Sequence, residues 1–375
     1  MTSPFLALPG AVADASGRVA AHYGEPVVEQ RMLAAGRAIV DLSDRGVVTV
    51  TGEDRLRWLD SLTSQAIAHL APGSSAETLL LDPQGRLEHS MRLVDDGTTT
   101  WLLVDGEQAE PLAAWLDRMR FMMQVEVADV SAQWATLGQL SSDGAKLVSA
   151  ATPHGVPLMW RDPWTVVQDG GWQYAASAEH PGVAYPAAEM LVARDEMPAL
   201  ADQALHGELA VAGTLALEAL RIAAWRPRQA TEADERTIPH ELDWMRSAVH
   251  LAKGCYRGQE TVAKVHNLGH PPRRLVLLHL DGSAGVLPDS GSSVLLDGAE
   301  VGRLTSSARH HELGPIGLAV VKRSLDPQAP LAVRIDAEGE SPAELIAAAQ
   351  EVIVPPEAGA TAGVPRIPRL GAVQR

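Results

Sequence analysis

The chain has 375 residues, a formal net charge of −16 and a single cysteine, and 46% of its residues are hydrophobic. This length predicts two or three packed units, and the apolar content excludes a wholly disordered chain. The acidic balance argues against broad binding to nucleic acid or to an anionic membrane, and one cysteine excludes a disulfide framework. The N-terminal run PFLALPGAVA has no basic segment, and no stretch of about 18 uncharged apolar residues occurs. We therefore expect a cytoplasmic protein with no membrane association.

The first 270 residues alternate strand and helix patterns, which is typical of an α+β protein. Residues 1–35 form an N-terminal leader of mixed small and polar character, predicted to be a strand or loop. Further elements follow from their periodicity: strands at 47–51, on both sides of a turn at 82–85, at 98–106, 125–130 and 133–140, a hairpin centred on 169–171, and helices within 53–62, 107–121 and 197–224. The polar segment 226–237 is expected to cross the surface as a loop.

The last third of the chain changes character. Gly269, Pro271 and Pro272 end a helical pattern and mark a domain boundary. Short strands separated by Gly, Pro and Asp then predict a C-terminal antiparallel β-barrel over residues 271–350. Residues 351–375 are rich in Pro, Gly and Ala without apolar periodicity, so they are predicted to be a disordered tail.

The only cysteine, Cys255, lies in the run KGCYRGQE at 253–260. Its neighbours include Lys253 and Arg257, and the following residues have the pattern of a half-buried helix. Nearby cations and a helix N-terminus both favour the thiolate, which is the nucleophilic and metal-binding form of cysteine. A purely structural cysteine is the competing interpretation, although such residues usually sit in apolar runs.

Basic residues are concentrated around this motif. Five cations and one acid lie between residues 253 and 274 of a chain that is otherwise acidic. This contrast indicates either a surface for an anionic ligand or partner, or a solvated helix face whose cations pair with acids elsewhere.

These residues also carry a resemblance to a known family. The run KGCYRGQETVAK, preceded by RIAAWRP and TIPHELDW, resembles the signature of the YgfZ-type folate-binding proteins, which are relatives of the aminomethyltransferase (T-protein) of the glycine cleavage system. DLSDRGVVTVTGEDRLRWLDSLTSQAI is similar to the opening strand and helix of the T-protein, and GRLTSSARHHELGPIGLAVVKR resembles its final barrel. The resemblance covers roughly residues 36–323.

The resemblance implies a cloverleaf of three units, with two intertwined α+β units at 36–270 that bind a tetrahydrofolate in a central cavity. It also implies a role in assembling or maintaining iron–sulfur clusters, with iron–sulfur client or assembly proteins as partners. Through such clients the protein would support tRNA thiomethylation without itself binding nucleic acid stably. The candidate catalytic residues are Cys255, Lys253 and Glu260. The candidate folate-binding residues are Arg221, Tyr256, Arg257, Gly258, Gln259 and Arg309.

Departures from the T-protein pattern concern the acids that handle the reacting nitrogen of folate. This chain has Glu88 and His89 in place of an acidic pair, and Ala223 in place of a glutamate after Arg221. Aminomethyl transfer is therefore expected to be lost, and a tetrahydrofolate-dependent one-carbon transferase acting on an amine or methyl donor remains the alternative. A folate-binding scaffold that makes no use of its thiol is a third hypothesis.

No metal site is assigned from the sequence. Adjacent side chains in a strand point to opposite faces, which disfavours shared ligation by His310 and His311. His266 and His270 have the spacing of zinc ligands on one helical face, but Gly269 makes a continuous helix there doubtful.

Overall fold

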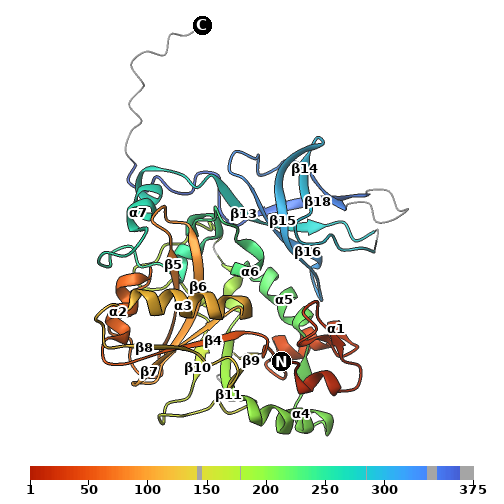
Figure 1. Ribbon diagram of the computed structural model, residues 1–375. Helices are drawn as coiled ribbons and strands as arrows, with labels where there is room; N and C mark the ends of the chain where they lie inside the picture. Colours follow the sequence, from red (N-terminus) through yellow and green to blue (C-terminus); the bar gives the residue numbers. More distant parts are fainter. Residues whose placement is uncertain (142–145, 178, 284, 336–343, 364–375) are drawn as a thin grey trace.

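The computed structural model describes residues 1–141, 146–177, 179–283, 285–335 and 344–363. Two five-stranded sheets with their helices form one side of the molecule, and a closed six-stranded barrel stands at the other (Figure 1). The predicted α+β fold with a C-terminal antiparallel barrel is confirmed.

The first sheet is antiparallel throughout, in the order β5-β6-β7-β4-β8. Its strands are β4 (Gly46–Thr51), β5 (Ser75–Leu81), β6 (Leu87–Asp95), β7 (Thr99–Val104) and β8 (Glu126–Asp129). Helices α2 (Arg55–Leu62) and α3 (Ala109–Met119) supply apolar side chains such as Leu59 and Leu112 to the core that these strands share. The alternation of buried and half-buried residues along β6 explains why the sequence pattern predicted this hairpin correctly.

The second sheet has the order β10-β11-β9-β3-β12, and β12 is the strand that runs parallel to its neighbour. Its strands are β3 (Ile39–Asp41), β9 (Trp134–Leu140), β10 (Met159–Arg161), β11 (Ala187–Ala193) and β12 (Val211–Ala212). Helices α4 (Met197–Leu205) and α5 (Thr214–Ala223) fall inside the helical region predicted at 197–224.

The N-terminal leader contains more structure than the expected strand or loop. It holds a paired β1 (Val12–Ala13) and β2 (Ala20–His22) and then α1 (Pro26–Ala34). Short 3-10 turns also occur along the chain: η1 (Pro4–Ala7), η2 (Gly106–Gln108), η3 (Pro163–Thr165), η4 (Pro181–Ala184), η5 (Arg194–Glu196), η6 (Pro239–Leu242) and η7 (Trp244–Arg246).

The barrel closes in the order β13-β16-β15-β14-β17-β18. Its strands are β13 (Arg273–Leu280), β14 (Ser293–Leu296), β15 (Ala299–His310), β16 (Gly314–Lys322), β17 (Leu331–Ile335) and β18 (Glu344–Val352). Helix α7 (Gln259–Leu268) precedes the barrel and ends at Gly269, as the sequence predicted.

Residues 351–363 differ from the predicted disordered tail. Ile353 and Val354 are fully buried, and the backbone N–H of Thr361 donates to the carbonyl of His266 at the end of α7. The apolar pair therefore anchors this segment, and residues 364–375 of the predicted tail lie outside the described residues.

The hairpin predicted around residues 169–171 is wrong. The backbone there pairs with a distant segment: Gln168 N–H donates to the carbonyl of Arg246 at 2.8 Å, and Leu251 N–H donates to that of Gly170 at 2.8 Å. A Cβ on Gly171 would lie 2.8 Å from the carbonyl oxygen of Arg246. Glycine therefore permits two distant segments of the chain to approach closely here, and it does not join two strands of a hairpin.

The turn between β5 and β6 lies against the residues that lead into α7. Gly258 has φ +85°, and a Cβ at this position would lie 2.6 Å from the carbonyl oxygen of Asp82 and 3.0 Å from the Cα of Gly85. Both the positive φ and the close contact require glycine. This packing fixes the loop that carries Cys255 against the first sheet.

We predict that Gly258→Ala lowers the free energy of unfolding by about 1–3 kcal/mol, because alanine is strained at a positive φ and collides with Asp82. Gly254→Ala is the matched control, since a Cβ at Gly254 meets nothing within 4 Å. Urea denaturation of the two variants measures the difference. Equal stability of both variants would contradict the close packing of this loop.

Candidate functional site

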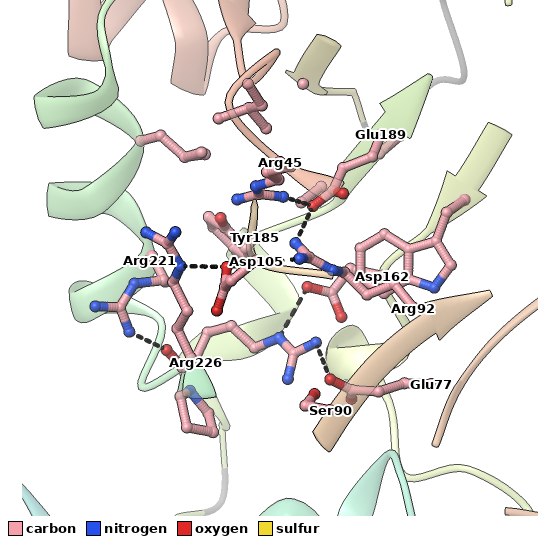
Figure 2. Close-up of a pocket in the computed structure, with 18 of the residues that line it drawn as sticks. Arg45, Glu77, Ser90, Arg92, Asp105, Asp162, Tyr185, Glu189, Arg221 and Arg226 are labelled. Carbon is pink, nitrogen blue, oxygen red and sulfur yellow. Dashed lines mark hydrogen bonds and ion pairs between the residues drawn. The ribbon is translucent and has the colours of Figure 1, made fainter. Parts of the chain in front are cut away.

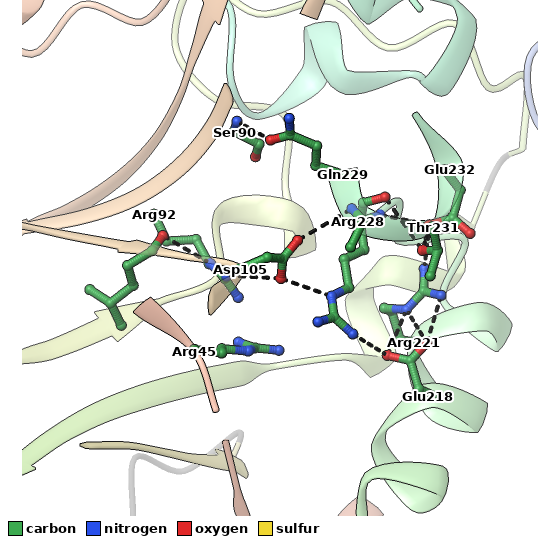
Figure 3. A network of polar contacts seen from close by, with 12 residues as sticks. Arg45, Ser90, Arg92, Asp105, Glu218, Arg221, Arg228, Gln229, Thr231 and Glu232 are labelled. Carbon is green, nitrogen blue, oxygen red and sulfur yellow. Dashed lines mark hydrogen bonds and ion pairs between the residues drawn. The ribbon is translucent and has the colours of Figure 1, made fainter. Parts of the chain in front are cut away.

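Charged side chains fill the centre of the molecule, where both sheets meet the barrel. Arg221 on α5 donates through Nη1 to Glu232 at 2.9 Å (Figure 3). Its Nη2 donates to Ser306 of β15 at 2.8 Å. It also pairs with Glu218 at 2.8 Å. Burial alone would lower the pKa of Arg221, but Glu218 and Glu232 raise it above its usual value. Arg221 therefore ties α5 and α6 (Gln229–Glu232) to the barrel.

Arg226 forms the second centre of charge. Its Nε donates to Asp162 at 2.9 Å and its Nη2 donates to Glu77 at 2.7 Å. Glu77 also accepts hydrogen bonds from Trp244 and Ser247. Burial raises the pKa of Asp162 to about 6; Arg226 opposes this shift and Glu77 adds to it.

Glu189 on β11 is held by two arginines, Arg92 on β6 and Arg45 in the turn before β4. Arg45 and Arg92 both donate to Glu189 Oε1, the latter at 2.7 Å (Figure 2). Burial would raise the pKa of Glu189, but the two guanidinium groups lower it below its usual value. The carboxylate is therefore ionised at neutral pH.

These groups surround a cavity of about 60 Å³. Its apolar walls come from Leu42, Trp160, Tyr185, Leu217 and Trp244. Two buried polar atoms in its lining have no hydrogen-bond partner among the described residues: Oε2 of Glu189 and Nη1 of Arg226. An acceptor and a donor left unpaired in a buried space can each bind a polar atom of a ligand or a water molecule.

The polar segment 226–237 is thus not the surface loop expected from the sequence. Arg226 and Glu232 are 5% and 3% exposed and enter the central networks. A run of charges usually indicates a solvent-exposed segment. Here Arg226 of the run pairs with Glu77 and Asp162, which are themselves buried, so the segment is drawn into the interior.

Cys255 lies outside this cavity. It is an exposed free cysteine in the loop before α7. The cavity lining includes Arg221, but no residue between 253 and 260. The structure therefore separates the thiol from the central charges.

The flanking cations of the cysteine serve to hold its loop. The Lys253 ammonium donates to the carbonyl oxygens of Asp60, Thr63 and Gln65 at 2.6–2.8 Å, at the end of α2. Burial lowers the pKa of Lys253, and Asp60 opposes that shift. Arg257 pairs with Glu88 of β6 and lies 5.6 Å from the ring centroid of Trp115 on α3. Both cations predicted to act on the sulfur are thus engaged by other groups.

The remaining candidate residues are scattered. Tyr256 is buried beneath the Lys253 ammonium, Gln259 donates to the carbonyl of Lys253, and Glu260 is exposed in the first turn of α7. Arg309 is on the barrel and donates to the carbonyl of Gly285. The structure brings 253–260 together at one surface but places Arg221 and Arg309 elsewhere.

The basic region 253–274 largely follows the second of its two interpretations. Lys253, Arg257 and Arg273 each pair with carboxylates. Arg274 is buried against the carbonyl of Leu325. Most of these cations therefore join parts of the fold to one another.

Glu189 and Arg226 were missed as candidates. The signal for Glu189 is a lone carboxylate in the middle of the apolar strand AAEMLVA, where a charge must be paired. Arg226 stands directly after the helix that carries Arg221, in the run RIAAWRP.

No group of three or more His, Cys, Asp or Glu residues suited to a metal ion occurs in the described part of the chain. His266 bonds to the hydroxyl of Tyr174, and His270 to the carbonyl of Ala358. Every described helix is too short or too polar to cross a lipid bilayer.

Comparison with known proteins identifies the family to which this chain belongs. Residues 22–155 match the GCVT N-terminal domain, and residues 273–349 match the glycine cleavage T-protein C-terminal barrel domain, together more than half of the chain. The protein belongs to the glycine cleavage T-protein (aminomethyltransferase) family.

Individual relatives are distant. A chloroplast protein of Arabidopsis thaliana named as a transferase is 26% identical over 309 residues, 77% of this chain and 66% of that protein. The tRNA-modifying protein YgfZ of Shigella sonnei is 26% identical over 306 residues, 80% of this chain and 90% of the relative. The crystal structure of aminomethyltransferase T from Bartonella henselae has the same fold, with a TM-score of 0.68 at 17% identity over 93% of this chain and 96% of that one.

Two buried carboxylates, Asp162 and Asp105, predict opposite effects of pH on the free energy of unfolding. In the folded protein Asp162 has a pKa of about 6, against a usual value of 3.8, so its carboxyl group stays protonated to a higher pH than it does in the unfolded chain. The free energy of unfolding should therefore fall, through this group, as the pH rises from about 4 to about 6. Asp162→Asn should flatten that part of the profile, measured by urea denaturation at a series of pH values.

Asp105 supplies the control of opposite sign. Although burial raises its pKa, Arg228 and Arg92 lower it to about 2. Its stabilising contribution is complete above about pH 4 and is lost as the pH falls toward 2, so Asp105→Asn should change only the acid limb. An unchanged slope between pH 4 and 6 in Asp162→Asn would show that Asp162 is not protonated there.

Proposed function

We propose that the protein binds a tetrahydrofolate in its central cavity and acts as an accessory factor for iron–sulfur proteins, with Cys255 as the working thiol. Through such clients it supports tRNA thiomethylation. Membership of the T-protein family supports the binding of tetrahydrofolate. The relative named as a tRNA-modifying protein supports the link to tRNA modification. The observation that carries the proposal is an exposed thiol on a loop that the fold holds rigid.

The chemistry of the cavity fits a pterin. The pyrimidine edge of a pterin presents adjacent N–H donors and a carbonyl acceptor. The unpaired Glu189 Oε2 is a charged acceptor for the former, and the unpaired Arg226 Nη1 is a donor for the latter. Trp160 and Trp244 supply flat apolar walls.

The cavity is small for this ligand. Its 60 Å³ lies well below the ~300 Å³ at which ligand pockets usually begin. Side chains that cross the cavity must therefore move when folate enters. Arg45 and Arg92 are the best placed to do so, because each shares Glu189 with the other. Tetrahydrofolate bound here would supply a one-carbon carrier, and the protein would orient its ring and exclude water.

The loop of Cys255 is built to present its side chain. Lys253 holds one end of the loop to three carbonyls at the end of α2, and Gly258 packs the other end against the β5–β6 turn. Tyr256 anchors the middle in the core. Cys255 itself is exposed, so its sulfur is accessible to a protein-borne iron or sulfur substrate. A four-iron cluster needs more thiolates than one, so the other ligands must come from a client or a small thiol.

The alternative is a one-carbon transferase acting on an amine or methyl donor. The observation in its favour is Glu88, which lies on β6 two residues before Ser90 of the cavity lining. Against it, Glu88 is paired with Arg257, and Ala223 offers no acid. Formation of 5,10-methylenetetrahydrofolate from a simple amine donor, abolished by Glu88→Ala, would establish the alternative.

We predict that Cys255→Ala fails to restore four-iron enzyme activity and tRNA thiomethylation in cells deleted for the endogenous gene, whereas wild type restores both. Cys255→Ser should fail as well, because a hydroxyl is a poor ligand for iron and a poor nucleophile without an activating base. Full rescue by both variants would make the cysteine structural. Absence of rescue by wild type would move the transferase to first place.

We predict that Glu189→Gln weakens tetrahydrofolate binding about tenfold or more, because it replaces a charged acceptor with a neutral one. Isothermal titration calorimetry measures the affinity. Glu260→Gln is the matched control, since Glu260 is exposed outside the cavity and its variant should bind as wild type does. Equal affinities of both variants for tetrahydrofolate would exclude the cavity as the pterin site.

A further inference from the structure

A second hollow adjoins the central cavity. It is a cleft of about 590 Å³ that opens at the surface beside the exposed side chains of Glu107 and Glu235. Asp105, Arg228 and Gln229 line both the cavity and this cleft, so these three residues stand between the two spaces. A ligand too large for the cavity can therefore extend into the cleft.

The residues between the two spaces are held by side-chain contacts. Arg228 donates through Nε to Asp105 at 3.0 Å, and the side-chain amide of Gln229 accepts a hydrogen bond from the backbone N–H of Ser90 at 2.6 Å (Figure 3). The Arg228 side chain is 28% exposed. Its rotation toward the cleft would widen the cavity without a change in the backbone.

The direction of a bound folate follows from the polar atoms of the cavity. If Glu189 binds the pyrimidine edge of the pterin, the tail leaves the opposite edge and points away from Glu189. Glu189 pairs with Arg45, which also lines a smaller cleft of about 370 Å³ on that side. Arg228 is separated from Glu189 by Arg92 and Asp105, and Figure 3 shows Asp105 between Arg92 and Arg228. The tail is therefore directed into the larger cleft, beyond Arg228.

The larger cleft is acidic. Of its carboxylates, Asp105 pairs with Arg228, and Asp234 pairs with Arg273, which lies outside the lining. Its other carboxylates, and its second arginine, Arg18, have no ion-pair partner among the described residues. These unpaired carboxylates are Asp14, Asp44, Glu107 and Glu235. The tail of a folate therefore meets one unpaired cation and four unpaired carboxylates.

We propose that the site selects a tetrahydrofolate with a single glutamate and disfavours folates with longer γ-glutamate chains. The two carboxylates of one glutamate can pair with Arg18 and with the exposed part of the Arg228 side chain. Each further γ-linked glutamate adds one negative charge, which the unpaired carboxylates of the cleft repel. This inference rests on the proposed function and adds the class of folate that the cavity accepts.

The affinities of the full-length protein for 5-formyltetrahydrofolate with one and with three glutamates test the proposal, measured by isothermal titration calorimetry. At low salt the triglutamate should bind about tenfold or more weakly than the monoglutamate, because its two added charges enter an acidic cleft. At about 1 M NaCl, where the screening length falls to about 3 Å, the two affinities should converge.

Glu107→Gln combined with Glu235→Gln should lower the discrimination at low salt about threefold or more, because two exposed carboxylates of the cleft lose their charge. Glu208→Gln is the matched control. Glu208 is exposed after α4, outside the lining of the cleft, and its variant should discriminate as wild type does. Both proteins should keep the melting temperature of wild type.

Equal or tighter binding of the triglutamate at low salt would overturn the placement of the tail and leave folate binding in the cavity standing. Undiminished discrimination in the double variant would overturn this cleft as the source of the selectivity. Absence of binding of either folate to wild type would overturn the proposed function together with this inference.

Discussion

The interaction on which the rest of the structure depends is the buried guanidinium of Arg226 between Asp162 and Glu77. It joins the segment after α5 to β5 of the first sheet and to the turn after β10 of the second. Removal of one partner from such a buried pair typically costs about 3–5 kcal/mol, because the other charge remains desolvated. Arg221 extends the same arrangement to the barrel through Ser306. The units therefore meet through charges, and the cavity between them has polar walls as a consequence.

The two features that bear on function are built differently. The cavity is formed by long-range ion pairs and keeps two unpaired polar atoms. The cysteine loop is held by the Lys253 ammonium, which donates to carbonyls at the end of α2, and by the close packing of Gly258 against the β5–β6 turn. A ligand in the cavity can influence the loop through Glu77, which accepts a hydrogen bond from Ser247 in the segment that leads to Cys255. The fold thus connects the cavity lining to the segment that leads to the exposed thiol.

Local periodicity is sufficient to predict most strands and helices, because elements such as β6 bury one face of a regular pattern. It failed where the partner is distant in the sequence. The backbone at 168–172 pairs with 245–251 and forms no hairpin, and residues 353–361 return to α7 and the core. The sequence indicated the thiol loop because its residues are contiguous. Glu189 and Arg226 are separated in the chain and become neighbours of one cavity only after folding.

A crystal structure of the protein with bound tetrahydrofolate tests the central claim most directly. The account predicts the pterin between Trp160 and Trp244, with hydrogen bonds to Glu189 Oε2 and Arg226 Nη1 and with Arg45 or Arg92 displaced. Cys255 should remain exposed in that complex. Folate bound at another surface, or a cavity unchanged at saturating ligand, would contradict the account.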